Sequence, residues 1–185
     1  MRIIMVRMQT IATSRVDNRI NQLISRIEAL PVPRAWQQRL VTLGVGLTVP
    51  YLATSSVQFE QVTDASVTLS LKNRRRVQNH MKSVHASAMF LLAEAATGTV
   101  LNANLPEGSR FSTTHIEVDY LRRAEGDLKA VATLSNEQRA LIRTTPKGKL
   151  SVPVRMLDEN GNEPATFVVE WSWKHAGKAS SPVVG

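Results

Sequence analysis

One acidic residue stands out because its neighbours along the chain are apolar. Between Val84 and Leu101, Glu94 is the sole side chain with a formal charge, and leucines and alanines flank it. Burying an unpaired carboxylate costs several kcal/mol, so such a residue is paired, protonated or used in chemistry. A carboxylate in such surroundings suits the role of a general base. The alternative is a glutamate on the helix surface at the rim of a sheet.

Two polar residues bracket the start of the same apolar segment. Asn79 and His85 stand where the free backbone amides and the positive dipole end of a helix can hold a developing oxyanion. Ser83 is the expected N-cap of this helix. Capping or packing is the alternative role for His85, and Asn79 taken singly is a loop residue.

Helix geometry separates these groups within one chain. Glu94 is nine positions after His85, which puts the two residues on opposite faces of the helix and about 13 Å apart along its axis. One chain therefore cannot bring both to one reacting carbon. If both serve the same site, two copies must face each other, and we expect a symmetric dimer with two shared sites, or a dimer of such dimers.

The elements that position these residues follow from hydrophobic periodicity. The spacing of apolar residues predicts amphipathic helices over residues 14–30 and 34–47. Near residue 54 the apolar residues begin to alternate with polar ones, which is typical of a strand. The order that follows is a hairpin, the apolar helix 84–101, a second hairpin of strands 116–120 and 128–134, a short helix 136–144 with a Ser135–Gln138 capping box, and strands 149–157 and 165–174.

This order predicts an α+β fold in which a curved antiparallel sheet wraps a long central helix. The predicted organisation is a helical N-terminal extension over residues 1–50, one domain over 51–176, and a disordered tail, rich in Ser, Pro and Gly, over 177–185. Met81 and Met89 are candidates to line a ligand tunnel, and core filling is the alternative.

Composition narrows the function classes. With 185 residues, 43% of them hydrophobic, the chain can bury one sizeable core, and its formal charge of +8 favours anionic partners. It contains no Cys, which excludes disulfides, thiolate metal sites and a cysteine nucleophile, and four His argue against a metal enzyme. No apolar run reaches the roughly 18 residues that span a membrane, and the start lacks a cleavable signal pattern, so we expect a cytoplasmic protein without membrane contact.

Two segments carry a resemblance to a known family. NHMKSVHASAMFLLAEAATG (79–98) resembles the signature of hotdog-fold acyl-CoA thioesterases of the phenylacetate-degradation type: an asparagine, a histidine at the start of the central helix, and an acid on that helix. IEVDYLRRAEGDL (116–128) is similar to the family's strand that ends in Leu-Arg-Pro-Ala before a glycine turn. The resemblance covers roughly residues 50 to 175 and implies a hotdog fold and thioester hydrolysis.

The resemblance also implies roles for matching positions. Glu94 would be the nucleophile or general base toward water, and the amides of Ala86 and Ser87 would polarise the thioester carbonyl. Asn79 would position the carbonyl or the water, and His85 would orient that loop. Thr97 stands near the place where some relatives carry a further polar residue. The substrate would be an acyl-CoA, with coenzyme A as part of the substrate and no further cofactor or metal.

Basic residues near the proposed site leave the choice of partner open. Arg76, Arg122 and Arg123 suit the phosphates of coenzyme A, and a solvated basic edge is the alternative. Because Ala86 and Ser87 stand where the family usually has two glycines, a non-catalytic acyl-ligand-binding hotdog protein is the second hypothesis.

A DNA-binding regulator that senses acyl-CoA is the third hypothesis. The helical extension would then be a helix-turn-helix unit ahead of the ligand domain. The sequence supports this poorly, since Pro-Val-Pro separates the two predicted helices and no third helix is evident. Nucleic acid is therefore not the expected partner.

Overall fold

A single antiparallel sheet of six strands forms the body of the protein, which the computed structural model describes over residues 15–176. The predicted tail and the N-terminal residues 1–14 lie outside the described residues. The strand order is β1-β2-β4-β5-β6-β3. The strands are β1 (Gln58–Val62), β2 (Ser66–Leu71), β3 (Arg110–Tyr120), β4 (Leu128–Thr133), β5 (Lys147–Asp158) and β6 (Ala165–Lys174).

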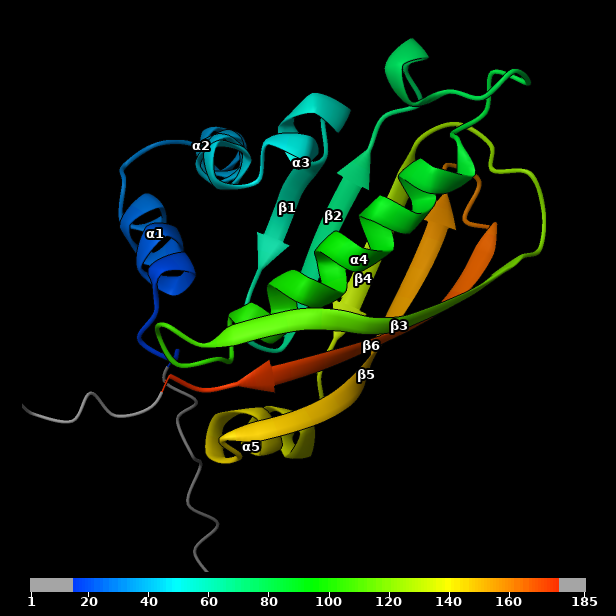
Figure 1. Cartoon of the computed structure of the whole chain (residues 1–185). Helices are drawn as coiled ribbons and strands as arrows, with labels where there is room; N and C mark the ends of the chain where they lie inside the picture. Colours follow the sequence, from blue (N-terminus) through cyan, green and yellow to red (C-terminus); the bar gives the residue numbers. More distant parts are fainter. Residues whose placement is uncertain (1–14, 177–185) are drawn as a thin grey trace, which may run out of the picture.

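The long helix α4 (Ala86–Asn102) lies across one face of the curved sheet (Figure 1). Strand alternation explains this packing, since Val67, Leu69 and Leu71 of β2 are fully buried while the residues between them are half-buried. On α4, Leu92 and Ala96 are also fully buried, because the helix has the sheet on one side and other helices nearby. The predicted α+β class with a curved sheet around a central helix is confirmed.

Strand pairing differs from the sequence prediction in one place. Strand β3 does not form a hairpin with β4; it pairs with β6, while β4 pairs with β2 and β5. The predicted hairpin is therefore wrong. Alternation of apolar and polar residues marks a strand and its buried face, but it does not identify the neighbouring strand. The connection after Tyr120 carries the chain from the edge of the sheet to its middle.

The N-cap residues predicted for two helices can be compared with the structure. The capping box at Ser135 and Gln138 is present and begins α5 (Asn136–Thr144), as predicted. The N-cap of α4 is His85 and not Ser83, whose hydroxyl instead donates to the buried carbonyl of Ala124. The Ser83 prediction is thus wrong, because that side chain is used in a tertiary contact.

Three helices precede the sheet: α1 (Arg19–Glu28), α2 (Arg34–Thr48) and α3 (Pro50–Ser55). Pro50 follows the end of α2 and is the first residue of α3, since the first helical position tolerates proline. Ile24 and Ile27 of α1 are buried in the same core as the sheet residues. None of the described helices is long and apolar enough to cross a membrane.

Side-chain amides attach α1 to the end of α4. The Asn18 side chain caps α1 and donates to the carbonyls of Asn102 and Leu105, at 2.9 and 2.8 Å. Asn21 donates to the carbonyl of Ala103 at 2.9 Å. These carbonyls lie at the end of α4 and in the turn that follows it, and the two side-chain amides join them to the start of α1.

Candidate functional site

Glu94 lies in the middle of α4, half-buried, beside β3. Its Oε1 accepts a hydrogen bond of 3.1 Å from the Thr113 hydroxyl of β3. No cation of residues 15–176 forms an ion pair with this carboxylate. A carboxylate that a single neutral donor orients keeps its remaining lone pairs for a water molecule or a substrate.

The start of α4 is organised by the two polar residues that the sequence singled out. His85 is the N-cap, and its Nδ1 accepts a hydrogen bond of 3.1 Å from the Ser87 amide. The Asn79 Oδ1 accepts from the amides of Met81 and Ser83, at 2.9 and 3.2 Å, and so fixes the turn before the helix. Both residues therefore hold backbone groups in place.

One amide at this helix start stays available. Ala86 is the first residue of α4, and its N–H has no acceptor among the described residues. Because the Ser87 amide already donates to His85, the Ala86 amide is the one of the two predicted oxyanion donors that can point at a ligand. Neither residue has a positive φ, so Ala86 and Ser87 fit without the backbone freedom of glycine.

The other predicted binding residues lie in different surroundings. Thr97 is fully buried, where its hydroxyl accepts from Trp171 Nε1 at 3.0 Å, so it belongs to the packing of α4 on β6. Arg76 donates to Ser56 Oγ at 3.1 Å, Arg122 to Asn162 Oδ1 at 3.4 Å, and Arg123 to the carbonyl of Met81 at 2.6 Å. All three arginines are exposed, and Arg123 adjoins the turn before α4.

One chain does not bring Glu94 to the helix start. Eight residues separate Ala86 from Glu94, which corresponds to about 12 Å along the axis. The carboxylate and the free amide of one chain therefore cannot contact the same carbonyl group. This agrees with the separation expected from the sequence.

A partly exposed face surrounds Glu94. Ser87, Phe90 and Glu94 follow one another at helical spacing on one side of α4, and Phe90 remains 37% exposed despite its aromatic ring. Strand β3 runs alongside, with Thr113 bonded to Glu94 and the Tyr120 hydroxyl donating to the carbonyl of Ala86. Within the described chain β3 pairs with β6 alone, so its second edge is open over eleven residues.

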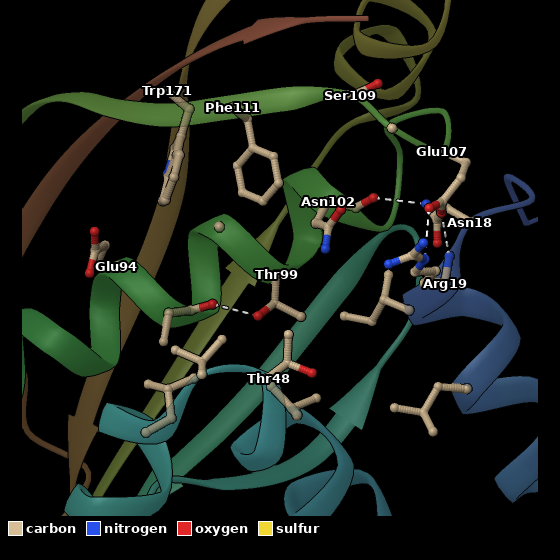
Figure 2. Close-up of a pocket in the computed structure, with 18 of the residues that line it drawn as sticks. Asn18, Arg19, Thr48, Glu94, Thr99, Asn102, Glu107, Ser109, Phe111 and Trp171 are labelled. Atoms are coloured by element: carbon tan, nitrogen blue, oxygen red, sulfur yellow. Dashed lines mark hydrogen bonds and ion pairs between the residues drawn. The ribbon is translucent and has the colours of Figure 1, made fainter. Parts of the chain in front are cut away.

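A cavity of about 640 Å³ opens on the side of α4 that faces the first three helices (Figure 2). Its α4 wall is a stripe at helical spacing: Leu91, Glu94, Ala95, Gly98, Thr99 and Asn102. Figure 2 shows Glu94 toward one end of this stripe and the Arg19–Glu107 ion pair beyond the other, with Thr48 on the opposite wall and Phe111 and Trp171 alongside.

The sequence prediction did not find this cavity. Met81, a predicted tunnel residue, is exposed, and Met89 is buried in the core; neither lines the cavity. The signal that was available is the run of small residues Ala95, Gly98 and Thr99 on one face of the helix. Among residues 15–176 no group of three or more His, Asp or Glu side chains is placed to hold a metal ion.

The curved antiparallel sheet around a central helix that carries an acid defines a hotdog-fold protein. The chain belongs to the family described as a domain of unknown function, DUF4442, whose model matches residues 37–173. No curated protein sequence matches it significantly.

Solved structures share this fold. A structural-genomics protein, APC5556, is 27% identical, with a TM-score of 0.67 over 85% of this chain and 99% of its own. A Pseudomonas aeruginosa protein of unknown function, described as a probable thioesterase, is 20% identical, with a TM-score of 0.65 over 80% of this chain and 99% of its own. The PaaI protein of the Escherichia coli phenylacetic acid degradation operon is 15% identical, with a TM-score of 0.57 over 78% of this chain and 94% of its own.

Proposed function

We propose that this protein hydrolyses acyl thioesters, with acyl-CoA as the substrate and the Glu94 carboxylate as general base toward water or as nucleophile. The observation that carries the proposal is the placement of Glu94: a carboxylate without a cation partner among the described residues, oriented by one hydroxyl, beside a cavity with largely apolar walls. That solved structures of the same fold bear the name thioesterase supports the same reaction class.

In the general-base route the atoms balance without a cofactor. Glu94 takes a proton from water as the water oxygen bonds to the thioester carbonyl carbon. The negative charge that develops on the carbonyl oxygen is stabilised by the free Ala86 amide at the positive end of α4. The carbon–sulfur bond then breaks, and the sulfur leaves as the thiol of coenzyme A with the proton that Glu94 returns.

The proposal requires a second copy of the chain, because 12 Å or so of helix separates the base from the amide. Ala86 and Glu94 each lie four residues from the exposed Phe90. A two-fold axis beside Phe90 would pair the α4 helices antiparallel and place Ala86 of one copy next to Glu94 of the other. We therefore propose a homodimer with two shared sites.

Strand β3 supports the same axis independently. Thr113 contacts Glu94 and Tyr120 contacts Ala86, so the point of β3 midway between these two contacts lies near Ile116, as Phe90 is midway between Ala86 and Glu94 on α4. Antiparallel pairing of two open β3 edges about this midpoint would satisfy their unpaired backbone groups. The helix and the strand thus favour one common dimer geometry.

Phosphate binding is proposed for the basic residues near the helix start. Arg123 lies beside the turn that precedes α4, and Arg76 and Arg122 remain exposed with weak neutral partners. Guanidinium groups bind phosphate oxygens in pairs of hydrogen bonds, as the diphosphate of coenzyme A requires.

A non-catalytic acyl-binding protein is the second candidate. The engaged Ser87 amide favours it, because only one of the two expected oxyanion donors is then available. Both candidates use the same cavity and differ in whether bound thioester is cleaved.

The substitution Glu94→Gln tests the proposal, because glutamine keeps the size of the side chain and can still accept from Thr113 but cannot take a proton. We expect kcat on acyl-CoA substrates to fall by about a thousandfold, within the range for loss of a general base. Glu163→Gln, on the surface and paired with Arg155, is the matched control and should leave kcat unchanged. Equal turnover by the Glu94→Gln variant and the wild type would refute the role of this carboxylate.

A further inference from the structure

The cavity between α4 and the first three helices has walls that are mainly apolar, and several of their polar groups are already hydrogen-bonded within the chain. The hydroxyls of Thr48 and Thr99 donate to carbonyls of their own helices, those of Gly44 and Ala95. The Asn18 amide group is used by the carbonyls of Asn102 and Leu105. The rest of the lining is largely hydrocarbon, from residues such as Leu23, Leu52 and Leu91. The Tyr51 hydroxyl and, at the far end, the Asn102 side-chain amide are polar exceptions.

The length of the cavity is set by α4. From Glu94 to Asn102 the helix rises about 12 Å. An extended hydrocarbon chain advances about 1.25 Å per carbon, from C–C bonds near 1.52 Å at tetrahedral angles. The stripe therefore accommodates a chain of about nine or ten carbons. Its volume also lies in the range of cavities that enclose small organic ligands.

The far end of the stripe adjoins an ion pair. Arg19 Nε lies 3.0 Å from Glu107 Oε1, and the Arg19 amide donates to Glu107 Oε2 at 2.8 Å. This pair joins the first turn of α1 to the loop that follows α4, beyond Asn102 (Figure 2). A longer hydrocarbon chain would have to displace water from these charged groups, which is unfavourable.

We propose that this cavity binds the hydrocarbon chain of a medium-length acyl group, of about nine or ten carbons, within one protomer. Placing the thioester carbonyl at Glu94 rests on the proposed function; the binding of the chain does not. The wall opposite α4 comes from α1, α2 and α3, so these helices, and not the partner-facing side of α4, select the acyl chain.

The substitution Thr99→Leu tests the proposal by shortening the cavity away from the carboxylate. Thr99 lies five residues beyond Glu94, about 7.5 Å along the helix, so a leucine there obstructs roughly the last three methylenes of a decanoyl chain. Each buried methylene is worth a factor of about four. We expect kcat/KM for decanoyl-CoA to fall about 50-fold, while that for butyryl-CoA stays within about twofold of the wild type.

Thr144→Leu is the matched control. Thr144 lies on α5, away from the cavity, and its hydroxyl donates to the carbonyl four residues back, as that of Thr99 does. This variant should treat all chain lengths as the wild type does. Leu23→Ala, which enlarges the cavity from the α1 side, should shift the preference toward longer chains such as myristoyl-CoA.

Retained turnover of butyryl-CoA shows that the Thr99→Leu protein is folded. A chain-length profile of that folded variant identical to the wild type, or an equal loss at every length, would overturn the proposal. If the wild type hydrolyses no acyl-CoA, the proposed function fails by itself, and calorimetric binding of decanoate decides the present proposal. Binding that Thr99→Leu weakens and Thr144→Leu does not would support it, and binding unaffected by either, or absent from the wild type, would overturn it.

Discussion

Replacing Ala86 with proline removes one backbone N–H from the helix start and little else. Ala86 is the first residue of α4, a position where proline is favoured because its fixed φ suits the helix and no intrahelical bond is lost. The preceding residue, His85, has φ −68° and ψ 144°, an extended conformation that a following proline allows. The variant should therefore fold with the stability of the wild type or slightly more.

The expected loss is catalytic. Removing one donor to a developing oxyanion costs about 3 kcal/mol, or 10²- to 10³-fold in kcat. We expect Ala86→Pro to lower kcat on the best acyl-CoA substrate by that factor, with an unchanged melting temperature. Arg34→Pro, at the first position of α2, is the matched control and should affect neither quantity. A folded Ala86→Pro protein whose kcat stays within about threefold of the wild type would contradict the proposed oxyanion role.

Mixing variants tests whether the site is shared. In a dimer of one Ala86→Pro chain and one Glu94→Gln chain, one site carries both substitutions and the other carries neither. After subunit exchange of equal amounts, half of the dimers are mixed, so activity should recover to about a quarter of the wild-type value. Recovery is impossible if each chain builds its own site, and its absence despite verified exchange would refute the shared geometry.

Two further substitutions probe the interface and the fold. Phe90→Lys puts a charge at the proposed axis, so we expect monomers by analytical ultracentrifugation and loss of hydrolysis; a monomer with full turnover would disprove the need for a second copy. For Asp64, burial raises the pKa of the carboxyl, but hydrogen bonds from Arg143 and Arg139 outweigh it and hold this pKa below its usual value. The folded state thus favours the charged form, and the stability gained at neutral pH is lost as the pH falls through the lowered pKa. Asp64→Asn should lower the free energy of unfolding at neutral pH by about 3 kcal/mol and make stability depend less on acid pH. Thermal melts across a range of pH would check this. If the melting temperature varied with pH as in the wild type, Asp64 ionisation would not contribute to stability.

Local patterns predicted most elements of the fold. The central helix follows from its apolar composition, and the α5 capping box from Ser135 and Gln138, because these signals depend on residues close in sequence. The pairing of β3 with β6 was missed, since the partner of a strand depends on contacts across the whole sheet. His85 was not expected as the cap because Ser, Thr, Asp and Asn are the usual N-cap residues.

The candidate site was predictable in part. Glu94 is conspicuous in the sequence because no other charge accompanies it in the helix, and its distance from the helix start follows from the rise per residue. The cavity could not be predicted, since it exists only once α1 docks on α4. That docking depends on hydrogen bonds from Asn18 to the carbonyls of Asn102 and Leu105. These partners are 84 and 87 positions away from Asn18 in the sequence.

Because α1 is attached to the last turn of α4, separate segments of the chain supply the acid and the cavity wall opposite it. The acid belongs to α4, which packs on the sheet. The opposite wall of the cavity beside it comes from the preceding helices, the last of which ends at Ser55. On this arrangement, insertions or replacements ahead of the sheet would reshape the cavity without moving the Glu94 carboxylate. The shape of the cavity and the position of the acid can then change independently of each other, through substitutions in separate parts of the gene.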